Sequence, residues 1–162
     1  MNLSRRALIG ASGGAIAAAW FWPVGGRSAP ARYEVTLTDA QWRAKLAPPV
    51  YEVLRHAATE HPFTSPLLNE HRKGIFACAG CALPLYSSAT KFESGTGWPS
   101  FWQPLRNAVV TSDDRSLGMD RTEVLCRRCG SHLGHVFDDG PKPTGLRYCM
   151  NGLALTFTPA KA

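Results

Sequence analysis

Two Cys-x-x-Cys motifs are the sequence feature that most constrains how this chain of 162 residues can fold. One is Cys78-Ala-Gly-Cys81 and the other is Cys126-Arg-Arg-Cys129. Each motif presents two thiols on one side of a tight turn, and two such turns supply the four sulfur ligands of a tetrahedral zinc site. Since four cysteines leave no ligand position open, we predict one structural Zn²⁺ ion that ties two distant parts of the chain together.

The same residues leave two alternatives to this metal site. An oxidising compartment would permit disulfides instead, although two short Cys-x-x-Cys pairs in a domain of this size fit zinc better. In a mixed site, His132 or His135 would replace a cysteine, because both continue the three-residue spacing that begins at Cys126. A complete shell of four cysteines does not need either histidine.

The fifth cysteine, Cys149, lies in a segment at 145–157 that predicts a strand, because it carries aromatic and β-branched residues without an internal proline. Alternation along a strand would place Arg147, Cys149 and Asn151 on one face. A guanidinium beside the thiol would stabilise the nucleophilic thiolate, against an ordinary thiol pKa of about 8.5. A lone cysteine in a strand is otherwise a small core residue.

The rest of the pattern predicts a mainly β protein of the α+β class with two short N-terminal helices. Residues 38–46 predict a helix with a capping box of Thr38 and Gln41, and a second helix begins at Pro48 and ends near Thr59. Further along, short apolar runs separated by Gly, Pro and Asp predict antiparallel strands. These runs are 75–78, 83–86, 108–112, 122–126 and 146–157.

The charge balance does not favour a nucleic-acid partner. A formal charge of +6 comes from 18 Lys and Arg residues against 12 Asp and Glu residues. Three of the arginines lie in the first 31 residues, which contain no acid, so the remainder is only mildly basic. The length fits one catalytic domain, and we expect a monomer.

Residues 1–31 have the pattern of an export signal. Arg5 and Arg6 precede an apolar run rich in Gly and Ala, and a small-residue cleavage site follows that ends at Ala31. These parts predict a secretory signal, and the paired arginines favour the twin-arginine route. We expect cleavage after Ala31, a mature domain of residues 32–162 and a periplasmic location. An uncleaved membrane anchor is the alternative, for which the apolar run is marginal.

Three blocks of sequence carry a resemblance to a known family. They are Ser-Gly-Thr-Gly-Trp-Pro-Ser-Phe at 94–101, Gly-Ser-His-Leu-Gly-His-Val-Phe-Asp-Asp-Gly-Pro at 130–141 and Gly-Leu-Arg-Tyr-Cys-Met-Asn at 145–151. Together they resemble the signature of the peptide-methionine (R)-S-oxide reductases, the B-type methionine sulfoxide reductases. The resemblance covers about residues 35–157. It implies a β-tent-like (Mss4-like) arrangement of antiparallel sheets and an enzyme that repairs oxidised proteins.

The resemblance also implies a mechanism. Cys149 would attack the sulfur of an R-configured methionine sulfoxide, release methionine and be left as a sulfenic acid. By resemblance, His132 and His135 face the sulfoxide oxygen, and His135 is the first choice as proton donor. Arg147 and Asn151 would assist the thiolate.

The S-methyl group of the substrate needs an apolar wall, and Trp98 fits because an aromatic face contacts methionine sulfur and methyl groups favourably. By resemblance, Phe137 extends this wall, and Asp138 or Asp139 orients a histidine. Thr96 departs from the pattern, since many relatives carry a second cysteine there that resolves the sulfenic acid. We therefore expect an external reductant, such as a thioredoxin-like protein or a small thiol, in preference to a zinc cysteine freed by local opening.

Two other functions are compatible with parts of this pattern. A zinc-stabilised β module that binds a protein partner needs the metal site but no nucleophile, and fold alone does not decide between the two. A thiol peroxidase would use the same reactive cysteine on hydrogen peroxide. The combination of Cys149 with two histidines, Arg147, Asn151 and Trp98 favours the sulfoxide reductase.

Overall fold

The structure is a computed structural model that describes residues 33–161. The expected export signal, with Arg5, Arg6 and the cleavage site after Ala31, lies outside the described residues. Two short helices come first in the described chain and nine strands follow, with every strand pair antiparallel. This is the mainly β, α+β class that the sequence predicts. Between residues 33 and 161, no helix has the length and apolar character needed to span a membrane.

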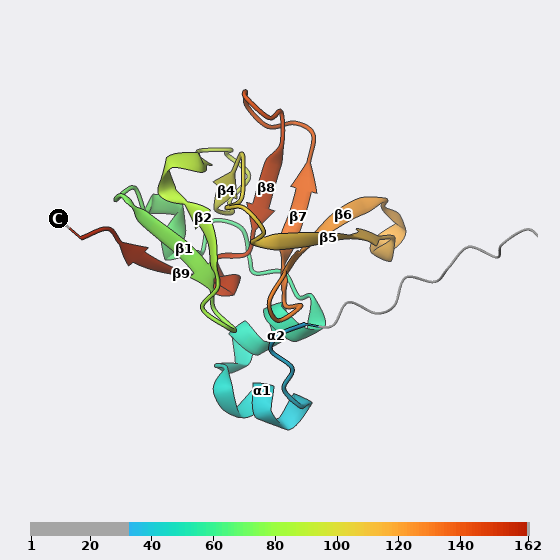
Figure 1. Ribbon diagram of the computed structural model, residues 1–162. Coiled ribbons are helices and arrows are strands. Elements are labelled where there is room, and N and C mark those ends of the chain that lie inside the picture. Colours follow the sequence, from blue (N-terminus) through green and yellow to red (C-terminus); the bar gives the residue numbers. More distant parts are fainter. Residues whose placement is uncertain (1–32, 162) are drawn as a thin grey trace, which may run out of the picture. The chain divides into compact units, whose positions relative to one another are not determined.

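The two helices are α1 (Asp39–Lys45) and α2 (Pro48–His56), and both lie below the sheets in the view of Figure 1. The predicted capping box is formed, because the Thr38 side chain accepts from the N–H of Gln41 while the Gln41 side chain accepts from the N–H of Thr38. α2 ends earlier than the sequence predicts, because Ala57 adopts a left-handed backbone with φ of 53°. Its buried side chains pack against the larger sheet.

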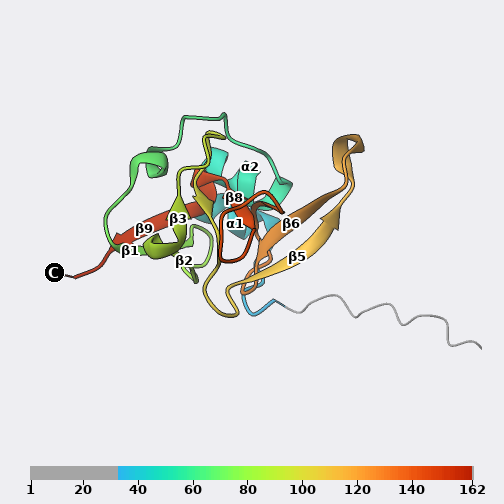
Figure 2. The same cartoon turned by 90° about the horizontal axis from the view of Figure 1, so that it is seen from above.

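The strands form two antiparallel sheets. They are β1 (Gly74–Cys78), β2 (Pro84–Ser87), β3 (Lys91–Phe92), β4 (Ser100–Phe101), β5 (Val109–Asp114), β6 (Arg121–Cys126), β7 (His132–Phe137), β8 (Arg147–Met150) and β9 (Leu155–Pro159). The smaller sheet has the order β2-β1-β9 and the larger sheet the order β3-β4-β8-β7-β6-β5. Figure 1 shows the two sheets side by side, and in Figure 2 the β5–β6 hairpin extends away from the smaller sheet.

The strand predicted over residues 146–157 is in fact two strands in different sheets. β8 ends at Met150, a 3-10 turn follows at Gly152–Ala154, and β9 then pairs with β1 in the smaller sheet. The buried Glu60 holds this turn, because its carboxylate accepts the N–H groups of Gly152 and Leu153. The chain therefore crosses from one sheet to the other directly after the segment that carries Cys149.

β7, which is not among the predicted runs, contains an extra residue. The register shifts by one between Val124 and Leu125 of β6, and this leaves Leu133 without a partner on that strand. One inserted residue reverses the alternation of faces. His132 and His135 would lie on opposite faces of a regular strand, but here they share a face, with ring centroids 5.4 Å apart.

The core lies on the face of the larger sheet that is opposite His132 and His135. Its packed side chains hold β8 in place. Its largest fully buried side chains are Tyr86, Phe76, Phe101, Leu54, Leu85, Leu133 and Met150. A Cβ atom on Gly134 would lie 2.1 Å from the carbonyl oxygen of Cys149, so only glycine lets β7 approach β8 this closely. Core packing and this close approach together set the position of the fifth cysteine.

Candidate functional site

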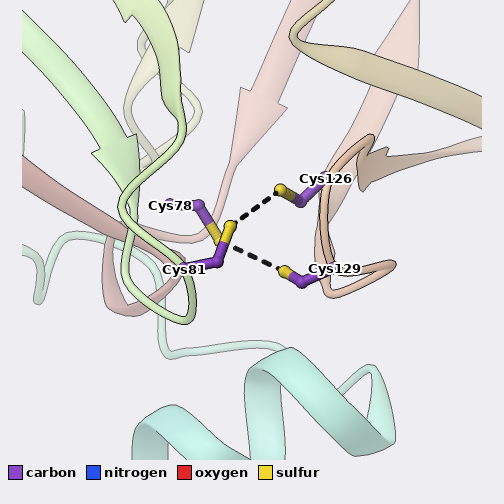
Figure 3. A group of neighbouring side chains, drawn as sticks. All are labelled: Cys78, Cys81, Cys126 and Cys129. Atoms are coloured by element: carbon purple, nitrogen blue, oxygen red, sulfur yellow. Dashed lines mark hydrogen bonds between the residues drawn. The ribbon is translucent and has the colours of Figure 1, made fainter. Parts of the chain in front are cut away.

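The four cysteines of the two motifs meet at the junction between the sheets. Cys78 ends β1 and Cys81 lies in the turn after it, whereas Cys126 ends β6 and Cys129 lies in the turn before β7. Figure 3 shows these two turns facing each other. Their Sγ atoms all lie within 4.8 Å of one another. The predicted grouping of the four thiols is therefore confirmed.

The distances between the sulfurs fit a metal site and not disulfides. The Sγ atoms of Cys78 and Cys129 lie 3.7 Å apart, and those of Cys81 and Cys126 lie 3.5 Å apart. A disulfide requires about 2.05 Å, whereas Zn–S bonds of about 2.3 Å in a tetrahedron separate the sulfurs by about 3.8 Å. Neither candidate histidine belongs to this group among the described residues. The four cysteines can hold a metal ion, and four thiolates are a donor set that suits Zn²⁺.

Cys149 lies in β8, outside this cluster, and its side chain is half-buried. Its direct cross-strand partners are Ser100 of β4 and His135 of β7, which share its face of the sheet. The hydroxyl oxygen of Thr96 lies 3.8 Å from the Cys149 Sγ. Ser94 connects the Thr96 and Ser100 hydroxyl groups through contacts of 2.9 and 2.7 Å. A chain of hydroxyl groups therefore borders the thiol on the β4 side.

Burial raises the pKa of the Cys149 thiol above its ordinary value. The Thr96 hydroxyl and the charge of Arg147 lower this pKa, as the sequence predicts for Arg147, but desolvation outweighs both. The guanidinium of Arg147 is also bound elsewhere, since it donates to the two carboxylate oxygens of Asp139 at 2.8 and 2.9 Å. It lies 4.4 Å from the centre of the Phe137 ring. Burial of the site therefore favours the protonated form of the thiol in the absence of substrate.

Each candidate histidine is paired with a carboxylate. Nδ1 of His132 lies 2.7 Å from the carboxylate of Glu123, and Nε2 of His135 lies 2.8 Å from that of Asp114. Burial lowers the pKa of His132, with a partly opposing effect from Glu123. Hydrogen bonds from Ser116 hold the pKa of Asp114 well below its usual range, and a hydrogen bond from His135 makes a smaller contribution in the same direction. The site thus combines a neutral buried imidazole with a charged carboxylate beside the second imidazole.

The sequence resemblance assigned Asp138 or Asp139, in the loop after β7, the role of orienting a histidine. In the structure, neither of them is the carboxylate paired with a histidine. Asp139 binds the arginine near the thiol, and Asp138 is exposed. The partners of the histidines come from β6 and β5. Glu123 lies directly opposite His135 in the β6–β7 pair, and Asp114 ends β5. Sequence reasoning missed these two acids because only the strand register brings them to the histidines.

Asn151 lies beyond the end of β8, so strand alternation does not place it beside Cys149. Its buried amide is fixed on three sides. Oδ1 accepts from the backbone N–H of Glu60 at 3.1 Å, while Nδ2 donates to the Leu133 carbonyl at 3.3 Å and lies 3.5 Å from Nε2 of His132. These contacts turn an N–H group of the amide toward His132, whose Nε2 is an acceptor in the neutral ring.

The two aromatic candidates occupy different parts of the site. Trp98 is half-buried and donates its indole N–H to the carbonyl oxygen of Glu60 at 3.1 Å, which fixes the ring in the loop before β4. Phe137 pairs with Arg147 across β7 and β8, two residues along from the His135–Cys149 pair, and so lies on the face of the thiol. Sequence reasoning also missed Glu60, which contacts Trp98, Asn151 and the turn after β8.

A cavity of about 460 Å³ opens beside the two histidine–carboxylate pairs. Both pairs line it, together with Arg121 and the segment that follows α2. Polar groups therefore surround a space next to the imidazoles that can hold a small polar group.

A mainly β domain with four cysteines that can hold a metal ion, and with a fifth thiol opposite a histidine, has the groups that a thiol-dependent redox protein needs. Residues 46–159 match the SelR domain family. The peptide methionine sulfoxide reductase MsrB of Leptospira interrogans is 53% identical over 126 residues, which cover 77% of this chain and 96% of that relative.

Two further relatives carry the same name. The protein of Thiobacillus denitrificans is 56% identical over 123 residues, covering 75% of this chain and 93% of its own length. The protein of Methanosarcina mazei is 50% identical over 129 residues, which cover 79% of this chain and 92% of that relative. The chain therefore belongs to the MsrB family of peptide methionine sulfoxide reductases, which are oxidoreductases, as the sequence blocks indicated.

Loss of the metal should destabilise the junction between the sheets. A strong chelator, or the variant Cys81→Ser, is expected to release zinc and lower the thermal unfolding temperature, because a binding free energy on the order of 10 kcal/mol contributes to folding. Zinc analysis and circular dichroism would measure both effects. Cys149→Ser is the matched control and should keep one zinc ion per chain. Unchanged stability of metal-free protein would contradict a structural site.

The pKa of Cys149 can be read from its alkylation by iodoacetamide, because only the thiolate reacts. We expect the rate to rise with pH to a midpoint above that of a free thiol, since burial disfavours the charge. Arg147→Met removes a positive charge and should move the midpoint to higher pH, whereas Asp139→Asn frees that charge and should move it lower. Mass spectrometry would confirm the modified residue. A wild-type midpoint at or below the free-thiol value would refute this account.

Proposed function

We propose that the protein reduces methionine (R)-S-oxide to methionine, mainly in oxidised proteins, and so repairs them. The observation that carries the proposal is a row of side chains on one face of the larger sheet. Cys149 lies opposite His135, and His135 lies opposite Glu123. A nucleophile and a group that moves protons thus occupy neighbouring positions. The relatives of the chain are named for reduction of peptide methionine sulfoxide.

In the first step, the sulfur of Cys149 attacks the sulfur of the sulfoxide as the thiol proton leaves. The bond that this attack forms between the two sulfurs is transient. It breaks together with the bond between oxygen and the substrate sulfur as the oxygen bonds to Cys149, which is left as a sulfenic acid while methionine departs. The substrate sulfur gains two electrons and the Cys149 sulfur loses two. The proton count also balances, because the thiol supplies the proton of the sulfenic acid. The charge of Arg147 would assist the transient thiolate.

We assign the transfer of this proton to His135, the direct cross-strand partner of Cys149. The nearby carboxylate of Asp114 would stabilise the protonated imidazole during the transfer. His132 would line the site as a neutral ring, because burial lowers its pKa. Asn151 would hold this ring in place through its amide N–H.

Trp98 and Phe137 would supply the apolar wall for the S-methyl group. The indole of Trp98 is already held by its hydrogen bond to the Glu60 carbonyl, so little side-chain freedom is lost when substrate binds. One face of the Phe137 ring is covered by the guanidinium of Arg147. Methionine sulfur and methyl groups interact favourably with such rings.

An external thiol would then regenerate the enzyme. A first thiol displaces water from the sulfenic acid and forms a mixed disulfide, and a second thiol releases Cys149 with formation of an external disulfide. Thr96 places a hydroxyl, and not a second thiol, 3.8 Å from the Cys149 Sγ. The remaining four cysteines would be held by one structural Zn²⁺ ion. We propose a thioredoxin-like protein or a small thiol as the reductant.

We also propose that residues 1–31 direct export to the periplasm by the twin-arginine route and are cleaved after Ala31, leaving a monomer of residues 32–162. This route carries folded proteins and would let the domain acquire zinc before export. Replacement of both Arg5 and Arg6 by lysine should keep the protein in the cytoplasm, which cell fractionation would measure. Unchanged export of this double variant would argue against the route.

The reaction itself is tested with the purified mature domain and dithiothreitol. The R epimer of a methionine sulfoxide peptide should be reduced and the S epimer should not. Cys149→Ser should lower the rate by on the order of 10³-fold or more, and His135→Gln should lower kcat by about 10²-fold or more. Absence of turnover would favour the non-catalytic module that binds a protein partner. Faster reduction of hydrogen peroxide than of sulfoxide would favour a thiol peroxidase.

The state of Cys149 after one turnover without reductant distinguishes the routes of regeneration. Mass spectrometry should find a sulfenic acid, trapped by dimedone, because no second thiol is available to resolve it. Thr96→Cys provides the matched comparison, since a thiol near the present hydroxyl should form a disulfide with Cys149. A disulfide between Cys149 and a zinc cysteine in the wild-type chain would overturn the external-thiol route.

A further inference from the structure

An exposed phenylalanine with an unusual backbone lies next to the proposed site. Phe63, between α2 and β1, is 70% exposed, compared with 47% for Met119. A single exposed apolar side chain needs no explanation. Phe63 also has a φ of +64°, however, in the left-handed region that bulky residues avoid. A bulky residue held in this conformation points to a role in binding.

The loop that carries Phe63 is fastened to the loop that carries Trp98. The N–H of Phe63 donates to the carbonyl oxygen of Gly97 at 2.8 Å, and the indole N–H of Trp98 donates to the carbonyl oxygen of Glu60 at 3.1 Å. A Cβ on Gly97 would lie only 3.0 Å from the Phe63 ring, so the two loops are in close contact. Contacts with the loop that carries Gly97 and Trp98 therefore fix the position of the exposed ring.

The same loop reaches the reactive thiol. Thr96 directly precedes Gly97, and its hydroxyl contacts the Cys149 Sγ at 3.8 Å. A methionine sulfoxide held at Cys149 belongs to a polypeptide whose extended backbone advances about 3.3 Å per residue. Residues next to the oxidised methionine would therefore pass over the loop that holds Phe63.

We propose that Phe63 binds an apolar side chain that lies close in sequence to the oxidised methionine in an extended polypeptide substrate. The inference rests on the proposed reductase function and refines its substrate class to apolar protein segments. Methionine is among the residues most often buried, so many of its oxidised forms become accessible only in unfolded segments, which expose other apolar side chains as well. Such a segment would cover the exposed ring of Phe63, while its methionine sulfoxide would reach Trp98 and Cys149.

The test compares two peptides that contain methionine (R)-S-oxide, one flanked by leucines and one by glycines, with dithiothreitol as the reductant. Phe63→Asn removes the ring but keeps the loop, because asparagine tolerates a left-handed backbone. This variant should raise KM for the leucine peptide about tenfold and leave kcat and the glycine peptide unchanged. Phe63→Leu should retain most of the preference, and Met119→Asn, on the β5–β6 hairpin, should leave both KM values unchanged.

The possible outcomes separate this inference from the reductase function. If the wild-type protein reduces both peptides and Phe63→Asn does not change the ratio of their KM values, the inference is overturned and the function stands. An equal loss of kcat on both peptides would also overturn it, since Phe63 would then only position the loop. The inference would also be overturned if Phe63→Asn changed the kinetics only when a protein reductant replaced dithiothreitol, because Phe63 would then bind the reductant and not the substrate. If the wild-type protein reduces neither peptide, the function and the inference fail together.

Discussion

The junction between the two sheets depends on four thiols that a single metal ion can hold. Cys78 and Cys81 belong to the end of the smaller sheet, and Cys126 and Cys129 flank the turn from β6 to β7 in the larger one. β6 and β7 carry Glu123 and the two histidines of the candidate site, so the position of these side chains depends on the junction. The turn at Gly152–Ala154 provides a second link between the sheets.

The candidate site brings together side chains in different protonation states on one face of the larger sheet. Burial raises the pKa of the Cys149 thiol and lowers that of His132, whereas hydrogen bonds lower the pKa of the Asp114 carboxylate. In the proposed reaction, the attacking thiol would supply the proton for oxygen transfer, and His135, which lies directly opposite, would move it.

Local patterns predicted much of the fold. The capping box at Thr38, the two N-terminal helices and the grouping of the four cysteines all follow from spacing within a few residues, and the structure agrees with each. The errors concern boundaries that tertiary contacts decide. The segment at 146–157 divides because Glu60, distant in sequence, accepts two N–H groups of the turn after β8. β3 and β4 are two residues long and carry no periodic signal.

The sequence by itself determined the chemistry that is available: four thiols for a metal ion, one thiol left over, and two histidines nearby. Only the tertiary structure decided how these groups meet. The extra residue Leu133 puts His132 and His135 on one face, and strand register brings Glu123 to the histidines. Desolvation, which no local pattern reports, raises the pKa of the free thiol despite a neighbouring arginine. Register and burial depend on contacts between residues far apart in the chain, and so they emerge only when the chain folds.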